Sequence, residues 1–400
     1  MLIDILVFVS ILTAFFLLFP FLEVLLSFFF PEKKRQPEIE DRAFDFGLII
    51  TAYKNIEIAV PLVESLLKQS YPNFVVYLVA DACEAGGFPV QDERLVVLRP
   101  QPALNLKVKS IIHAVEHFRR NHDFIGVFDA DNLAHPHFLT EINRYCNAGY
   151  QVIQGQRTAK NLDTIYACAD ATGEFYKNYI ERYLPFRLGS SAVISGSGMV
   201  VEAEIYRAYL NSPEIAEGQK LYKRMLQEDK ILQNFLLRQN IRIAYAWDAV
   251  VYDEKVTTGE AVTTQRSRWL FSYFQNIPNV LGIFRRSLQK GSFNQFWFGM
   301  ITISPPLFIL VFTAMGLALL GIWLQPAITW LLVIALCMFT ANIFFTLYLS
   351  KVPPAIWKAV WGIPFFIWRQ VKGLFRMFNP DKNFKHTEHQ KSVKIDDLMK

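Results

Sequence analysis

Residues 124–131 read FIGVFDAD, a short apolar run that ends in two aspartates with one residue between them. Three other apolar runs precede it, FGLIIT at 46–51, FVVYLVA at 74–80 and LVVLR at 95–99, and stretches with helical periodicity lie at 58–68 and 107–119. Short apolar runs that alternate with helices indicate parallel strands joined by crossover helices. The sequence therefore predicts an α/β fold over residues 40–270, with a mostly parallel Rossmann-type sheet flanked by helices.

Acidic residues stand at the ends of these predicted strands. Asp81 follows the run at 74–80, and Asp129 and Asp131 follow the run at 124–128. Ligands of open α/β sheets bind beyond the carboxyl ends of the strands, so the three carboxylates are expected to meet there. Clustered carboxylates repel one another unless a cation compensates them, and Mg²⁺ or Mn²⁺ suits that role. A solvated turn is the alternative interpretation of the motif Asp129-Ala130-Asp131.

A second acidic motif lies downstream. Glu228 and Asp229 precede an amphipathic helix predicted at 230–239. Acidic residues in this position either take part in chemistry or stabilise the helix N-terminus. The Gly-rich stretch 195–198, with Gly196 and Ser197 at its centre, either cradles an acceptor or forms an ordinary turn.

The third motif is the segment QRSRW at 265–269. If the segment is helical, Gln265, Arg268 and Trp269 share one face. An amide, a guanidinium and an indole together suit a diphosphate and a sugar ring. A membrane-interface belt is the alternative, because Trp269 precedes a long apolar run.

The composition excludes several classes of protein. Hydrophobic residues make up 52% of the 400 residues and charged residues only 19%, so the chain is neither disordered nor typical of a soluble enzyme. A net charge of +5 is too small and too dispersed to indicate a nucleic acid partner. The four cysteines lack CxxC spacing, which argues against a zinc site or a disulfide framework. The five histidines between 113 and 137 follow no ligand spacing and are expected on the surface or in packing.

Two parts of the chain are apolar enough to cross a membrane. Residues 291–350 contain no Asp, Glu, Lys or Arg, and this length of helix suffices for two spans, near 296–324 and 328–349. Ser304-Pro305-Pro306 is expected to kink the first span or to shorten its regular part. Residues 1–31 are predicted to be a retained anchor, because the run lacks the basic start of a cleaved signal peptide.

Basic residues next to the apolar segments indicate their orientation, because cytoplasmic loops carry an excess of Lys and Arg. The relevant residues are Lys33, Lys34, Arg35, Arg285, Arg286, Lys290 and Lys351. We therefore expect a multi-pass protein of the plasma (inner) membrane with residues 40–270 in the cytosol. Residues 271–290 and 355–378 are predicted to be interfacial helices, with a fourth crossing as the alternative for 355–378, and 379–400 a cytosolic tail.

Taken in order, these motifs resemble those of family-2 membrane glycosyltransferases, the inverting enzymes that include cellulose-, hyaluronan- and poly-N-acetylglucosamine-synthase-like proteins. The resemblance covers about residues 45–390 and places the membrane helices in the expected order. The matching segments are Ile50-Thr51-Ala52-Tyr53, SLLKQSYPN at 65–73, Val79-Ala80-Asp81, Asp129-Ala130-Asp131, Gly196-Ser197-Gly198, Glu228-Asp229, the QxxRW set at 265–269 and Phe384-Lys385-His386-Thr387.

The resemblance implies a GT-A-like domain that binds a nucleoside-diphosphate sugar, with UDP as the expected nucleotide. Thr51, Tyr53 and Asp81 are then expected to hold the base and ribose. Asp129 and Asp131 are expected to bind Mg²⁺ or Mn²⁺ at the diphosphate, with Asp131 as the more direct ligand. The phosphate-facing lysine is Lys109, with Lys107 as the alternative.

The same resemblance assigns the acceptor side. Asp229, next to Glu228, is expected to be the general base, and Arg268 is expected to neutralise the departing nucleoside diphosphate. Trp269 is expected to stack on the acceptor, Gln265 to close the site, and Gly196 and Ser197 to contact the acceptor. The sequence departs from the family at Gln227, where the family usually has Thr.

The acceptor and the number of transfers stay open at this level. A polysaccharide or a lipid-linked saccharide at the lipid bilayer is the expected acceptor. One alternative is a single transfer to a lipid phosphate, and another is a non-catalytic membrane scaffold that has kept the fold. Two C-terminal spans are fewer than in polymer-extruding synthases, which argues against a translocation channel.

Overall fold

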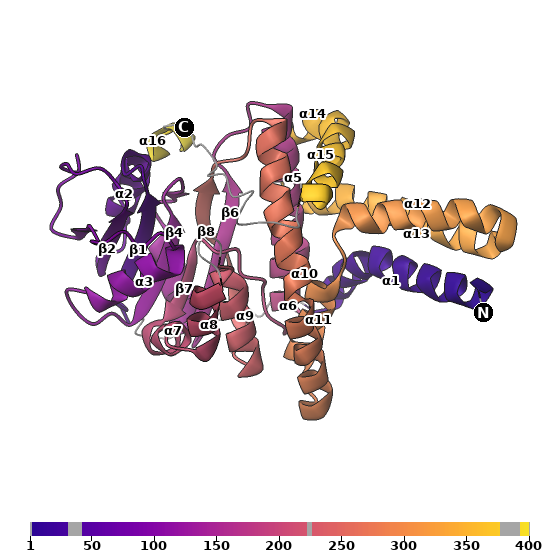
Figure 1. Cartoon of the computed structure of the whole chain (residues 1–400), viewed down its shortest axis with the longest axis horizontal. Coiled ribbons are helices and arrows are strands. Elements are labelled where there is room, and N and C mark those ends of the chain that lie inside the picture. The colour runs from indigo at the N-terminus through magenta and orange to yellow at the C-terminus, as the bar shows by residue number, and fades with distance from the viewer. Residues whose placement is uncertain (1, 31–41, 222–225, 377–392, 400) are drawn as a thin grey trace.

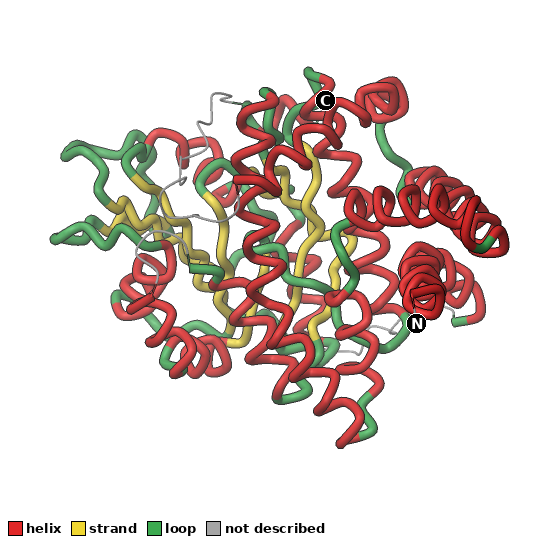
Figure 2. Tube along the Cα trace, turned by 45° about the vertical axis from the view of Figure 1, so that its right-hand side comes forward, coloured by secondary structure: helices red, strands yellow, loops and turns green. Residues whose placement is uncertain are grey.

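The computed structural model describes residues 2–30, 42–221, 226–376 and 393–399. The basic flank at 31–35, the matching segment Phe384–Thr387 and most of the expected tail lie outside the described residues. Within the described ranges, one sheet with helices around it forms the larger part of the molecule (Figure 2).

The sheet has eight strands in the order β3-β2-β1-β4-β7-β6-β8-β5. The strands β1 to β4 are mutually parallel where they pair, and β6 is parallel to β8. β7 runs antiparallel to both β4 and β6, and β5 runs antiparallel to β8. The predicted mostly parallel sheet is confirmed, with two antiparallel strands added. The strands are β1 (Phe46–Tyr53), β2 (Phe74–Asp81), β3 (Leu95–Leu98), β4 (Phe124–Asp129), β5 (Leu133–Ala134), β6 (Val152–Ala159), β7 (Met199–Glu202) and β8 (Ile243–Asp253).

Both faces of the sheet are buried. Ile49 of β1 packs in one hydrophobic core, whereas its neighbours Leu48 and Ile50 pack in the other. Because strand side chains alternate between faces, continuous apolar runs such as 46–50 are the signature of a sheet covered on both sides. Six helices of the same domain cover the two faces of the sheet. They are α2 (Val60–Leu67), α3 (Lys107–Glu116), α4 (Phe138–Asn147), α7 (Ala203–Leu210), α8 (Pro213–Leu221) and α9 (Glu228–Arg238).

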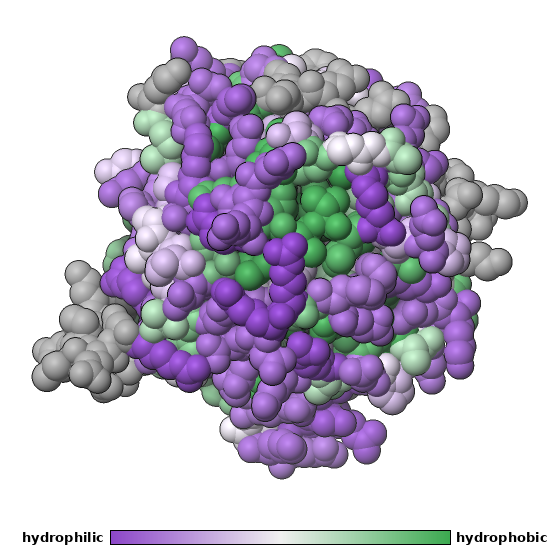
Figure 3. Space-filling view, turned by 90° about the vertical axis from the view of Figure 1, so that its left-hand side faces the viewer, coloured by the Kyte–Doolittle hydropathy of each residue, from purple (hydrophilic) through white to green (hydrophobic). Residues whose placement is uncertain are grey.

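Three helices among the described residues are long and apolar enough to cross a membrane. They are α1 (Leu2–Phe29), α12 (Leu307–Leu324) and α13 (Pro326–Leu349), and they extend together from one side of the molecule (Figure 1). The opposite end of the molecule exposes mainly hydrophilic residues around a smaller apolar patch (Figure 3).

The first C-terminal span is shorter than the sequence predicted. Helix α11 (Phe293–Ile303) ends before Ser304-Pro305-Pro306, and α12 starts only at Leu307. Proline lacks the backbone N–H that would continue the helix ladder, so consecutive prolines separate the two helices here. The expected span at 296–324 therefore contains two helices, of which only the second is long enough to cross.

A long helix lies between the sheet and the three apolar helices (Figure 1). This helix, α10 (Gly259–Lys290), runs without a break through the expected boundary between residues 270 and 271. The expected interfacial helix at 355–378 is divided into α14 (Pro354–Ala359), a 3-10 turn at Val360–Gly362 and α15 (Ile363–Arg376). α15 has 14 residues, about 21 Å of helix, which is too short for a bilayer core of about 30 Å.

The remaining elements connect these layers. Helix α5 (Ile165–Lys177) continues through a π-helical turn at Asn178–Tyr183 into α6 (Leu184–Arg187), and α16 (Ile395–Leu398) lies near the end of the chain. α5 stands beside α10 in the same intermediate layer (Figure 1).

Candidate active site

A cavity of about 2050 Å³ opens at the carboxyl ends of the parallel strands. Thr51 and Tyr53 line it from the end of β1, Asp81 from the end of β2, and Asp129 and Asp131 from the end of β4 and the turn after it. β1 pairs with both β2 and β4, so the three strand ends are neighbours. The carboxylates that lie 50 residues apart in the chain therefore share one cavity.

Lys107 connects the acidic groups. Its ammonium nitrogen lies 2.7 Å from Asp129 Oδ1 and 3.1 Å from Glu228 Oε1, and it donates a hydrogen bond of 3.2 Å to the carbonyl oxygen of Gly196. Burial acts to lower the pKa of Lys107, but the two carboxylates outweigh it and hold that pKa above its ordinary value. Lys107 therefore stays protonated and offsets negative charge at the centre of the cavity.

The acidic pair at the start of α9 faces the same space. Glu228 and Asp229 both line the cavity, and a Cβ added at Gly196 would lie 3.6 Å from Asp229. That distance is an ordinary contact, so the preference for glycine comes from the backbone: Gly196 has φ +81°, a conformation that residues with a side chain rarely adopt. Burial raises the pKa of Glu228, Lys107 lowers it, and Asp229 raises it further.

Gln227, where the sequence departs from the family, ties α9 to α10. Its amide donates to Gln275 at 2.5 Å and accepts from the hydroxyl of Ser272 at 2.6 Å. Both partners are on α10, so the glutamine fixes the acidic helix start against the long helix.

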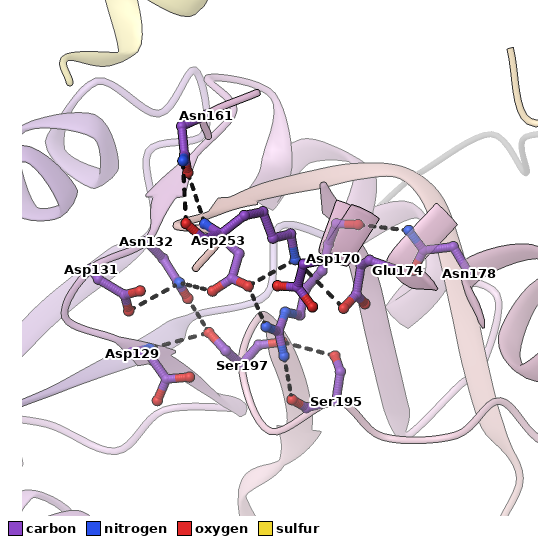
Figure 4. Close-up of polar contacts among 12 residues, drawn as sticks. Asp129, Asp131, Asn132, Asn161, Asp170, Glu174, Asn178, Ser195, Ser197 and Asp253 are labelled. Atoms are coloured by element: carbon purple, nitrogen blue, oxygen red, sulfur yellow. Dashed lines mark hydrogen bonds and ion pairs between the residues drawn. The ribbon is translucent and has the colours of Figure 1, made fainter. Parts of the chain in front are cut away.

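A buried polar network supports the aspartate motif from below (Figure 4). The amide of Asn132 donates to Asp131 at 3.4 Å and to Asp253 at 3.2 Å. Ser197 donates to the amide oxygen of Asn132 and accepts from the backbone N–H of Asp129 at 3.1 Å. The network thus orients both ends of the turn that carries Asp129 and Asp131.

Two cations neutralise Asp253 within this network. Arg157 lies 2.5 Å and Lys255 lies 3.0 Å from the same carboxylate oxygen of Asp253. Burial alone raises the pKa of Asp253, but the two cations outweigh it and lower that pKa below its ordinary value. Glu174 extends the network through ion pairs with Arg182 at 2.7 Å and Lys255 at 3.6 Å.

The sequence interpretation missed Arg157 and Asp253. They stand near the end of β6 and at the end of β8, two strands that are parallel neighbours. The rule that strand ends carry the site also applies to them. Arg157 and Asp253 are almost 100 residues apart in the chain, however, so their ion pair leaves no local motif in the sequence.

The third motif lies on α10, as its helical spacing predicted. Gln265, Arg268 and Trp269 all line the cavity, and burial lowers the pKa of Arg268. The guanidinium of Arg266 lies 4.1 Å from the centre of the Trp269 ring and forms an ion pair with Asp170 of α5. Trp269 as a whole is 37% exposed.

Two predicted site residues lie elsewhere. Ser197 is fully buried and its hydroxyl donates to Asn132, so in this structure it supports the aspartate turn, and its contact with an acceptor stays a prediction. Lys109 is not part of the cavity lining, whereas Lys107 is. Residues two positions apart on a helix are separated by about 200° of rotation, so one lysine faces the site and the other does not.

Asp81 lines the cavity, but its carboxylate is already engaged. It accepts hydrogen bonds from the backbone N–H groups of Leu104 and Asn105, both at 2.7 Å.

The aspartate pair fits a divalent metal ion by its chemistry. Mg²⁺-type ions are bound by one or two carboxylates, with water and substrate phosphates completing the shell, and Asp129 and Asp131 offer two carboxylates into the cavity. Among the described residues, the group of three side chains with ligand atoms close enough to share an ion lies elsewhere, at His113 and Glu116 of α3 and His117 directly after it. A metal at the aspartates therefore needs oxygens from a bound ligand.

Comparisons with known proteins give a family match and a similar solved structure. Residues 43–272 match the family model described as "Glycosyltransferase like family 2". A search of curated proteins finds no match. Among solved structures, the chain is similar to the mannosyltransferase PcManGT from Pyrobaculum calidifontis in complex with GDP-Man and Mn²⁺, with a TM-score of 0.50 and 12% identity over 92% of this chain and 99% of that one.

A second solved structure, TarS from S. aureus, aligns with a TM-score of 0.39 and 13% identity over 87% of this chain and 56% of TarS. At these identities the likeness of PcManGT concerns the fold alone. It agrees with the GT-A-like arrangement of a curled, mostly parallel sheet flanked by helices.

Proposed function

Since the chain belongs to glycosyltransferase family 2, we propose that it is a membrane-bound, inverting enzyme that transfers a sugar from a nucleoside-diphosphate sugar, with UDP as the nucleotide, to a saccharide or lipid-linked acceptor. The observation that carries the proposal is the cavity at the strand ends. It gathers Asp129, Asp131, Glu228 and Asp229, and Lys107 forms ion pairs with Asp129 and Glu228 within it.

The donor is assigned to the strand-end side of the cavity. Tyr53 and the loop held by Asp81 face the nucleoside, since Tyr53 donates to Asn105 at 2.8 Å and Asp81 holds the backbone of the same residue. Lys107 and Arg268 supply positive charge for the diphosphate. A Mg²⁺ or Mn²⁺ ion at Asp129 and Asp131, when bound, adds charge neutralisation of the leaving diphosphate.

Asp229 is assigned the role of general base. It lines the cavity beside the positive-φ turn at Gly196. The carboxylate takes the proton of the acceptor hydroxyl as that oxygen attacks the anomeric carbon, on the face opposite the leaving group. Trp269, which is 37% exposed and lines the cavity, is assigned to the acceptor, because aromatic side chains pack well against sugar rings.

The helices α1, α12 and α13 are proposed as membrane spans, with the domain that carries the cavity in the cytosol at the inner membrane. The three helices extend from the same side of the molecule (Figure 1), which allows all of them to enter one bilayer. In this orientation the cavity opens beside the membrane surface, where a membrane-bound acceptor is presented.

The test is a screen of nucleotide sugars against the purified full chain, with release of nucleoside diphosphate as the readout, in the presence of Mn²⁺ and in the presence of a chelator. We expect one donor to be consumed, with turnover that depends on the ion. A chain that binds no nucleotide sugar and releases no nucleoside diphosphate with any donor is the non-catalytic scaffold instead.

A further inference from the structure

The cavity does not end at α10. It continues between α12 and α13, where Phe308, Phe312 and Met315 line it from one helix and Leu336, Phe339 and Ile343 from the other. We name this part the apolar arm. The arm and the catalytic carboxylates belong to one continuous space, although α10 stands between the sheet and the apolar helices (Figure 1).

The apolar arm offers nothing to a sugar. Of the described side chains with which α12 and α13 line the cavity, Thr340 is the polar one, and its hydroxyl already donates to the carbonyl of Leu336 at 2.8 Å. A saccharide hydroxyl placed there would lose its hydrogen bonds to water without replacement, which costs about 1–3 kcal/mol for each group. A polysaccharide is therefore a poor occupant.

Hydrocarbon is a good occupant. Phe312 and Met315 are each 49% exposed, and they lie on a helix that is long and apolar enough to cross a membrane. The lining positions on α12, from Leu307 to Met315, rise about 12 Å along the helix. An alkyl chain lying along this stripe covers apolar surface on the protein that would otherwise contact bulk lipid.

The junction between the arm and the catalytic part has the character of a membrane interface. Trp269 lines the cavity from α10, with Lys177 5.0 Å from its ring centre and Arg266 over the same ring. Arg266 also lies 5.1 Å from the ring centre of Phe366 on α15, whose side chain lines the cavity. Tryptophan and basic residues are the residues that anchor proteins at the head-group level of a bilayer.

We propose that the acceptor is a membrane lipid whose hydrocarbon chain lies in the apolar arm and whose head group passes Trp269 to reach Asp229. This inference rests on the proposed function and narrows its acceptor. In the transfer, the head-group oxygen forms a bond to the anomeric carbon and gives its proton to Asp229. The bond from the anomeric carbon to the phosphate oxygen breaks, and the nucleoside diphosphate leaves with that electron pair.

The experiment uses washed membranes that contain the full chain and a radiolabelled nucleotide sugar. The readouts are donor cleavage and the partition of labelled product between organic solvent and water. Met315→Trp and Thr340→Phe fill the arm from its two walls. Leu320→Trp is the matched control, because Leu320 is 53% exposed, is not part of the cavity lining and lies about 140° around α12 from Met315.

We expect the wild-type product to enter the organic phase. We expect each arm variant to reduce its yield at least tenfold, with donor binding and the Leu320→Trp control at the wild-type level. A labelled product that stays in the aqueous or insoluble phase overturns the inference, as does wild-type yield in both arm variants. If wild-type membranes cleave none of the donors, the proposed function itself fails, and that outcome is distinct from donor cleavage with a water-soluble product.

Discussion

The ammonium nitrogen of Lys107, at the start of α3, lies 2.7 Å from a carboxylate oxygen of Asp129, at the end of β4. The same nitrogen reaches Glu228 at the start of α9. One lysine thus joins the start of α3 to the end of β4 and to the start of α9, which lies about 100 residues further along the chain. It compensates acidic groups that would otherwise repel one another at a single edge of the sheet.

Lys107→Met is expected to reduce donor turnover roughly 100-fold, because it removes a fixed positive charge from the site of the departing diphosphate. Lys109→Met is the matched control and should retain near wild-type turnover, since Lys109 is outside the cavity lining. Release of nucleoside diphosphate measures both. Equal losses in the two variants would show that the charge near the helix start matters in general, not the contact to Asp129.

Asp131→Asn is expected to weaken the dependence of turnover on a divalent ion. Asp131 is 7% exposed and held by Asn132, so the substitution changes charge with little change in shape. The concentration of Mn²⁺ for half-maximal turnover should rise at least tenfold. Titration of chelator-treated protein with Mn²⁺ gives this value, and an unchanged half-maximal concentration contradicts the assignment of Asp131 as a ligand.

Asp253→Asn is expected to lower stability in a way that depends on pH. The pKa of Asp253 is held below its ordinary value, so its ion pairs stabilise the fold fully above the unfolded value of about 4. This contribution disappears as the pH falls through the lower pKa of the folded state. Breaking a buried pair of this kind costs about 3 kcal/mol at neutral pH.

Thermal unfolding in detergent at a series of pH values measures this effect. The wild-type midpoint should fall more steeply with acid below about pH 4 than the midpoint of the variant, so the two curves converge. Parallel curves with a constant separation would mean that Asp253 contributes packing and not charge pairing.

Much of the donor side could be predicted from sequence because it follows from local patterns. Apolar runs that end in aspartate place Asp81 and Asp129 at strand ends, and the sheet then brings neighbouring ends together. The helical spacing of Gln265, Arg268 and Trp269 predicted that they share one face of a helix. All three line the cavity from α10.

Other features depend on tertiary packing and gave no local signal. Lys107 and Lys109 differ only in the rotation of α3 relative to the sheet, which the sequence does not specify. Ser197 lies in a Gly-rich stretch that suggested a ligand contact, yet its hydroxyl is used within the protein to orient Asn132. The apolar arm depends on how α12 and α13 pack together. The sequence of each helix alone indicates only an ordinary membrane span.

The claim most open to direct test is that Asp229 removes the proton from the acceptor. The measurement is sugar transfer in washed membranes by Asp229→Asn, with Asp248→Asn, an exposed acid, as the control. The account predicts that Asp229→Asn lowers transfer by about 100-fold or more while nucleotide-sugar binding and the control variant stay at the wild-type level. Transfer by Asp229→Asn near the wild-type rate would contradict it.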